Sequence, residues 1–162
     1  MRDVLVDGRT IIWSGLAFLA LTIGFGIWIQ AYDLQMILDE LSNSDQIRRV
    51  VAEMSAEQRA GHWWMTLVLD YAYPLAYGSF FAGLALRNFD KAGLWIAIPA
   101  FLSVPADMIE NTIQLFILSG DEALIGVKTI VTPIKLVSFV LAAIIALFGI
   151  ALAAYQRLAG AD

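Results

Sequence analysis

The stretch V-P-A-D-M-I-E-N-T-I-Q-L-F, from Val104 to Phe116, places two carboxylates and two amides inside an otherwise apolar run. On a helix its polar residues share one face with the serine just before it, because they are three, four or seven positions apart. These residues are Ser103, Asp107, Glu110, Asn111 and Gln114. The other faces are apolar enough to contact lipid or neighbouring helices. The stretch is therefore predicted to be part of a membrane-spanning helix with one polar stripe.

The composition of the whole chain points to the same class of protein. Of the 162 residues, 60% are hydrophobic and 15% are charged, which leaves too little polar surface for a water-soluble domain. The net charge is -5, and no basic block predicts nucleic-acid binding. Cysteine is absent, so disulfides, thiolate zinc sites and cysteine nucleophiles are excluded. His62 is the only histidine of the sequence. No metal site is predicted.

Four stretches are long enough to cross a bilayer, which takes about 20 apolar residues per helix. Tryptophan and tyrosine residues stand near their ends, as is typical of membrane interfaces. Short connections make the last three stretches antiparallel neighbours. The predicted fold is all-α: a polytopic membrane protein and an antiparallel four-transmembrane-helix bundle, forming a single integral membrane domain over residues 1–162. The spans are predicted at residues 10–31, 62–86, 92–118 and 129–155.

Lysine and arginine residues are denser in the loops on the side of the two termini. The positive-inside rule then predicts a multi-pass protein of the cell membrane with both termini cytoplasmic. The loop 32–61 would be extracytoplasmic.

Two short amphipathic helices are predicted within the loop 32–61, because apolar residues recur there with helical spacing. The first set is Leu34, Ile37, Leu38 and Leu41, and the second is Ile47, Val50, Val51 and Met54. These helices either lie on the membrane surface or cover the bundle as a lid. Ser55 and Gln58 match a capping box, so the second span is expected to begin as a helix above the membrane.

The second and fourth spans each carry a polar stripe of their own. The second stripe holds His62, Thr66, Asp70, Tyr73 and Tyr77, and the fourth holds Lys128, Thr132, Lys135 and Ser138. At a rise of about 1.5 Å per residue, the four charged groups of these spans belong to the outer half of the bilayer. Asp70, Asp107, Glu110 and Lys135 are therefore expected to meet around one cavity.

The balance of charges and the positions of the prolines both favour a functional site at this depth in the membrane. Three acids against one lysine leave two excess negative charges, which calls for shared protons, a bound cation or a cationic ligand. Pro74, Pro105 and Pro133 each stand near one of these charges. Because proline has no N–H, Pro74 frees the backbone carbonyl of Asp70, and free carbonyls at membrane depth are tolerated where they line a polar cavity.

The function predicted from these residues is binding of a small amphiphilic or lipid-like molecule, with acid/base conversion left open. Asp70 or Glu110 would act as the base, Asp107 as the acid and Lys135 as the anchor of negative charge. The predicted ligand-binding residues are Asn111, Gln114, Tyr73, Tyr77, Thr66 and Thr132. Membrane lipid is the expected surrounding partner, and a homo-oligomer stays open. The sequence names no cofactor and does not decide whether the protein is an enzyme.

Two other functions stay open. A small proton- or cation-coupled transporter would use the same carboxylates, although the inner halves of the last three spans are nearly all apolar. A non-catalytic subunit of a membrane complex would use the charges as an internal salt-bridge network. No motif with an assigned activity is present.

Overall fold

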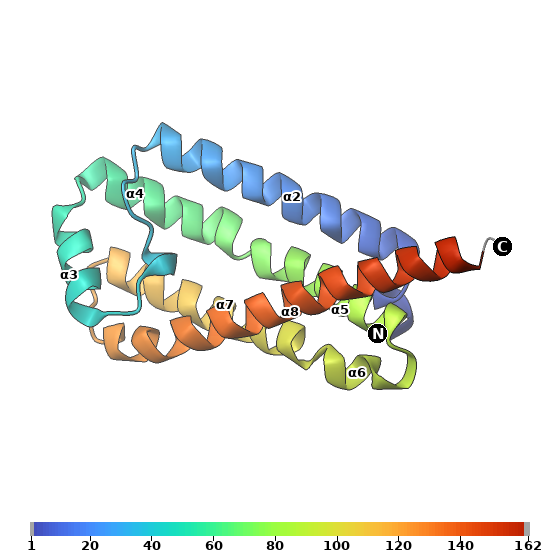
Figure 1. Ribbon diagram of the computed structural model, residues 1–162. Helices are drawn as coiled ribbons and strands as arrows, with labels where there is room; N and C mark the ends of the chain where they lie inside the picture. The colour runs from blue at the N-terminus through green and yellow to red at the C-terminus, as the bar shows by residue number, and fades with distance from the viewer. Residues whose placement is uncertain (1, 161–162) are drawn as a thin grey trace.

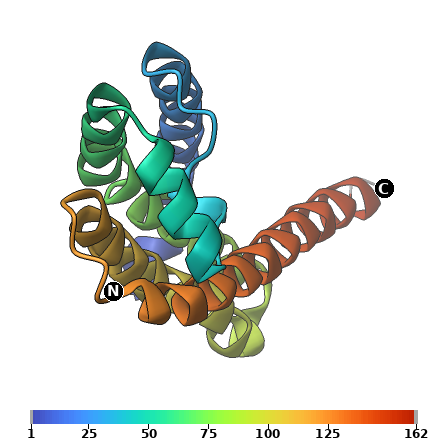
Figure 2. The same ribbon diagram turned by 90° about the vertical axis from the view of Figure 1, so that its left-hand side faces the viewer.

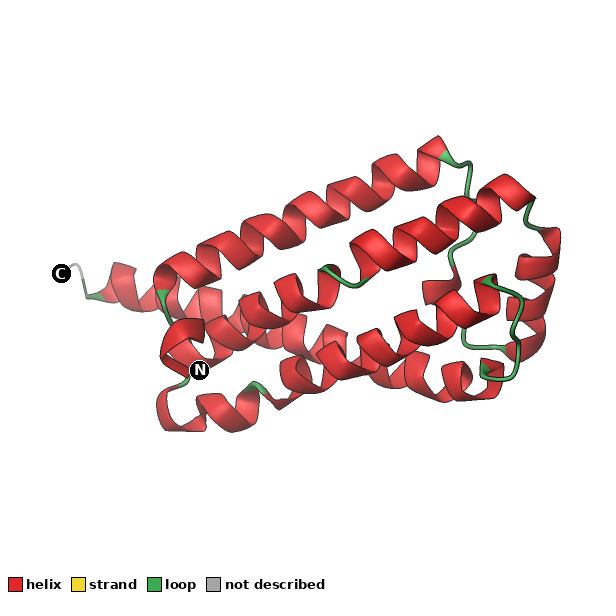
Figure 3. Cartoon of the chain, turned by 180° about the vertical axis from the view of Figure 1, so that it is seen from behind, coloured by secondary structure: helices red, strands yellow, loops and turns green. Residues whose placement is uncertain are grey.

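The computed structural model describes residues 2–160, and that part of the chain is helical with no strand. Helices α2, α5, α7 and α8 lie side by side (Figures 1 and 3). The segment η2 is a π-helix, whereas η1 and η3 are 3-10 turns. In chain order the elements are α1 (Arg2–Leu5), α2 (Gly8–Ala31), η1 (Leu38–Glu40), α3 (Ser44–Glu53), α4 (Ala56–Met65), η2 (Thr66–Asp70), α5 (Tyr73–Asn88), η3 (Asp90–Ala92), α6 (Gly93–Ile96), α7 (Ile98–Leu118) and α8 (Ile125–Ala159).

Within residues 2–160, three helical stretches are long and apolar enough to cross a membrane: Gly8–Ala31, Gly93–Leu118 and Ile125–Ala159. They overlap the stretches predicted from the sequence at residues 10–31, 92–118 and 129–155. α2 and α8 also expose long rows of apolar side chains, a surface that suits lipid and not water. The row on α2 includes Ile12, Leu16, Leu19, Ile23 and Ile27, and the row on α8 includes Ile130, Ile134, Val137, Leu141 and Ile144.

The predicted second span, residues 62–86, is not one continuous helix. α4 passes into the π-helix η2, a turn follows at Tyr71 and Ala72, and α5 begins with Pro74 in its first turn. The break is visible as a loop in the middle of the helix in Figure 3. Pro74 cannot donate to the carbonyl of Asp70, and its ring disfavours an uninterrupted helix. The backbone hydrogen-bond pattern of the helix therefore changes at Asp70, whose side chain is buried.

α5 is the central helix, since it packs against α2, α7 and α8. Aromatic rings fill the space between them: the ring centroid of Tyr77 lies 4.8 Å from that of Phe139 and 6.4 Å from that of Phe18. α5 and α7 approach closely at Gly78, where an added Cβ would lie only 2.2 Å from Val104 Cγ2. This close approach brings Tyr77 beside the polar face of α7.

The loop 32–61 closes one end of the helix array (Figure 2). Residues 34–41, here called the strap, bury Leu34, Leu38 and Leu41. The prediction of an α-helix in the strap is wrong: the strap forms only the 3-10 turn η1, because its apolar residues are held by tertiary contacts and not by one helical face. The capping box is confirmed, since Ser55 Oγ accepts from Gln58 N at 3.1 Å and Gln58 Oε1 from Ser55 N at 3.0 Å.

Candidate functional site

Glu110 on α7 lies at the centre of a buried charged cluster. Its Oε1 accepts hydrogen bonds from Lys128 Nζ and Thr132 Oγ1, and its Oε2 pairs with Lys135 Nζ. Lys128 and Glu110 are fully buried. Because Lys128, Thr132 and Lys135 are four and three residues apart, one face of α8 directs both ammonium groups to the same carboxylate.

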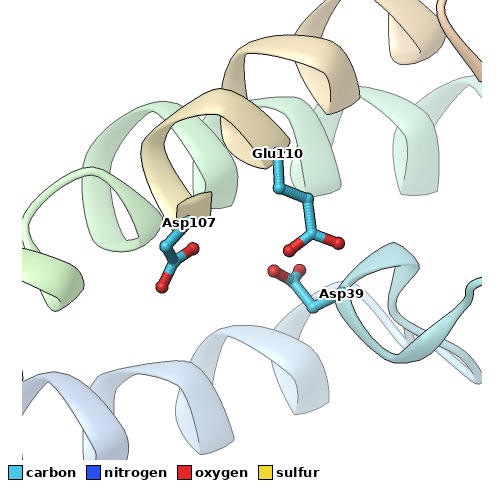
Figure 4. A group of neighbouring side chains, drawn as sticks. All are labelled: Asp39, Asp107 and Glu110. Carbon is cyan, nitrogen blue, oxygen red and sulfur yellow. The ribbon is translucent and has the colours of Figure 1, made fainter. Parts of the chain in front are cut away.

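Lys135 also joins two further carboxylates to the cluster. Its Nζ lies 3.8 Å from Asp107 Oδ1 and 3.2 Å from Asp39 Oδ1. Figure 4 shows the carboxylates of Asp39, Asp107 and Glu110 gathered in one place. One oxygen from each lies within 4.8 Å of the others, a spacing that would suit a cation. The ammonium of Lys135 contacts all three, so the chain itself supplies a cation to this position.

Asp39 is the residue that the strap contributes to the cluster. Burial raises the pKa of Asp39, but the positive charges of Lys135 and Lys128 more than offset this and lower the pKa to about 2. The carboxylate is therefore ionised at physiological pH. Its Oδ1 accepts a second hydrogen bond from Gln114 Nε2 at 3.1 Å.

His62 holds the strap from the side of α4. Its buried ring accepts a hydrogen bond at Nε2 from the backbone N–H of Leu38 at 3.0 Å. Its Nδ1 lies 3.4 Å from Thr66 Oγ1. A ring nitrogen that accepts a hydrogen bond carries no proton, so this contact requires the neutral imidazole with its proton on Nδ1. The strap is thus fastened at two adjacent residues, Leu38 and Asp39.

Asp70 differs from the other acids because no ion pair reaches it within residues 2–160. The residue is only 5% exposed, and its Oδ2 has no hydrogen-bond partner there. Its backbone carbonyl accepts from Asn111 Nδ2 at 2.8 Å. The side-chain amide of Asn111 thus donates the hydrogen bond that Pro74, which has no N–H, cannot donate. Through this bond α7 contacts the backbone where the second predicted span is interrupted.

The structure brings most of the predicted site residues together. Asp107, Glu110 and Lys135 are in direct contact, and Thr132 bonds to Glu110. Tyr77 donates from its hydroxyl to Asp107 Oδ2 at 2.9 Å. Gln114 and Asn111 reach Asp39 and Asp70 as described above.

Tyr73 and Thr66 are less directly placed. The Tyr73 hydroxyl lies 3.4 Å from Thr22 Oγ1, and its ring packs 5.2 Å from that of Phe18. Thr66 contacts His62. Both residues lie on the predicted stripe, and the Thr66 side chain is also within hydrogen-bonding reach of Asp70.

Three residues of this region were not among the predicted site residues: Asp39, His62 and Lys128. Lys128 is spaced to lie on the same helical face as Thr132 and Lys135. Its position before the apolar run is, however, typical of a lysine in a loop. Asp39 and His62 belong to segments expected at the membrane surface. Adding Asp39 and Lys128 gives four carboxylates and two ammonium groups, so the excess of two negative charges persists.

The cluster is closed, which differs from the cavity expected from the sequence. Glu110, Asn111, Gln114 and Lys128 are all fully buried. A cavity of about 530 Å³ lies near the loop 32–61, but it is lined by Arg59, Trp63, Trp64 and other residues outside the cluster. Access to the fully buried carboxylate of Glu110 therefore requires movement of the strap or of a helix.

Fold and site together define a helical protein with three membrane-type helices and a group of buried acidic residues. Comparisons with protein-family models, with curated proteins and with solved structures found no match.

Proposed function

We propose that this chain binds the positively charged head group of a small amphiphilic molecule within the membrane. The observation that carries the proposal is Asp70, a buried carboxylate without a cationic partner in the described residues, beside a cluster with more acids than lysines. Ionisation of a buried carboxyl group that has no cationic partner costs several kcal/mol in real proteins. A ligand with an ammonium group would supply the missing charge, and the bilayer would supply the environment for its apolar chain.

The proposal includes four membrane spans, with α4, η2 and α5 together forming the second. This broken segment runs alongside α2 between the two ends of the molecule (Figure 1). α1 and the C-terminal end of α8 lie at the same end, as an even number of crossings requires, and the strap lies toward the other (Figure 1). With both termini cytoplasmic, the cluster would belong to the extracytoplasmic half of a cell membrane.

Single cysteines test this topology, because the natural chain has none. Asn43→Cys and Asp121→Cys are expected to react with a membrane-impermeant thiol reagent in intact cells, whereas Asn88→Cys reacts only after lysis. The opposite labelling pattern would invert the orientation and put the cluster in the cytoplasmic half.

The same geometry supports acid/base conversion of the bound molecule as the finer form of the proposal. Asp70 is the better base of the two carboxylates named from the sequence, because the ammonium groups of Lys128 and Lys135 already neutralise Glu110. In its protonated form, Asp107, whose Oδ2 is hydrogen-bonded to the Tyr77 hydroxyl, would deliver the proton, and Lys135 would stabilise developing negative charge.

A second candidate is a non-catalytic subunit whose charges order its helices. It is favoured by the closed state of the cluster and by the pairing of Asp39, Asp107 and Glu110 with lysines. For such a subunit, Asp70→Asn removes an unpaired buried charge and raises stability without affecting any ligand.

Binding of dodecylamine separates the two candidates, with dodecan-1-ol as the uncharged comparison. For the detergent-solubilised protein, we expect the amine to raise Tm and the alcohol not to; linkage gives about 2.7 kcal/mol at 100 times Kd. Asp70→Asn should abolish this rise, whereas Glu53→Gln, at an exposed carboxylate of α3, should retain it. An equal rise in wild type and Asp70→Asn would contradict the proposal.

A further inference from the structure

Lys135 and Gln114 present two donors to a single carboxylate oxygen, and that oxygen belongs to the strap. Lys135 Nζ and Gln114 Nε2 lie 3.2 and 3.1 Å from Asp39 Oδ1, although the three residues are far apart in sequence. Gln114 is fully buried, and the side chain of Lys135 is 13% exposed. An ammonium and an amide N–H directed at one oxygen form a site for a carboxylate, with one charge-assisted bond.

Asp39 differs from the other acids of the cluster in how it is held. Asp107 and Glu110 project from the long helix α7, whereas Asp39 lies in the three-residue turn η1 of the otherwise irregular strap. Its side chain is 18% exposed and its Oδ2 has no hydrogen-bond partner in the described residues. Asp39 therefore sits at the outer edge of the cluster, on a segment that is irregular apart from one 3-10 turn.

We propose that Lys135 and Gln114 form a carboxylate-binding subsite, which Asp39 fills in the closed state and a carboxylate of the ligand fills when the strap leaves. In the closed state the carboxylate of Asp39 thus occupies the position that a carboxylate of the ligand would occupy. The assignment to an amphiphile rests on the proposed function, in which Asp70 receives the ammonium group. Together the two positions select a zwitterionic head group, such as an amino acid joined to an alkyl chain.

The charges of the cluster agree with this exchange. In the closed state, four carboxylates face two lysines. If a zwitterionic head group replaced Asp39, four carboxylates would face two lysines and one ligand ammonium. The excess would fall from two negative charges to one, and each end of the head group would meet a group of opposite charge.

Chemical rescue of Asp39→Ala tests the subsite without knowledge of the ligand. Removal of the Asp39 carboxylate should lower Tm, because Lys135 and Gln114 each lose one hydrogen-bond partner. Sodium acetate should then restore most of the lost Tm in a saturable manner, whereas sodium chloride at equal ionic strength should not. Acetate should have no such effect on Asp39→Ala combined with Lys135→Met. The matched control is Asp45→Ala, at an exposed carboxylate of α3, which acetate should not rescue.

The wild-type protein provides a second measurement if Asp39→Ala does not fold. Sodium decanoate should speed hydrogen exchange at the Leu38 amide at least tenfold by displacing the strap, whereas decan-1-ol should leave it unchanged. Equal effects of decanoate and decan-1-ol, or acetate rescue that survives Lys135→Met, would overturn the subsite. Either result leaves the dodecylamine test at Asp70 standing, so the two proposals fail separately.

Discussion

Glu110→Gln is expected to lower the free energy of unfolding by about 3 to 5 kcal/mol, the cost of breaking a buried ion pair from one side. The fully buried carboxylate of Glu110 pairs with both Lys128 and Lys135, so its neutral isostere leaves Lys128 buried without its carboxylate. Denaturant or thermal unfolding in detergent micelles measures the loss. Lys128→Met in the same chain should recover part of it, because the pair is then removed as a whole.

Glu122→Gln is the matched control for this substitution. Glu122 pairs with Arg48 at 3.2 Å, but about half of each side chain is exposed to solvent. An exposed pair contributes about 0 to 1 kcal/mol, so the same chemical change should have little effect there. If Glu110→Gln and Glu122→Gln cost the same, the buried charges do not form the network described.

Lys135→Met is also expected to cost about 3 to 5 kcal/mol, because three carboxylates lose their shared ammonium group. The second substitution that restores stability identifies the direct partner. Asp39→Asn should rescue best, since Lys135 is the lysine that pairs with Asp39. Glu110→Gln should rescue less, because it removes the partner of Lys128.

Lys91→Met, at an exposed lysine, serves as the control for loss of a positive charge and should change stability by no more than about 0.5 kcal/mol. Asp70→Asn is informative in the same series, because Asp70 has no ion pair with Lys135. If Asp70→Asn rescued Lys135→Met better than Asp39→Asn did, the assigned contacts of Lys135 would be wrong.

Helical periodicity was sufficient to predict much of the site. The spacing of Asp107 and Glu110 fixes the face of α7 on which both lie, and Thr132 and Lys135 do the same for α8. The short connection between the two helices makes them neighbours, so their polar faces meet. The missing N–H of Pro74 likewise predicted a free carbonyl at Asp70, which Asn111 occupies.

The remaining parts depend on tertiary contacts that periodicity does not encode. The leucines of the strap have helical spacing, yet the backbone forms a single 3-10 turn that places Asp39 on Lys135. Lys128 occupies a sequence position where a lysine usually belongs to a loop. Its burial follows from its contact with Glu110. The π-helix before Pro74 also could not be read from the apolar length of its span.

The distance between a labelled ligand nitrogen and the side-chain carboxyl carbon of Asp70 tests the central claim most directly. Solid-state NMR on the protein in bilayers, with ¹⁵N-dodecylamine and ¹³C-labelled aspartate, measures this distance through dipolar coupling. We expect a contact consistent with an ion pair, with nitrogen and oxygen within about 4 Å, that disappears in Asp70→Asn. A coupling that persists in Asp70→Asn, or bound amine without coupling to any aspartate, would contradict the proposal that Asp70 receives the ligand's positive charge.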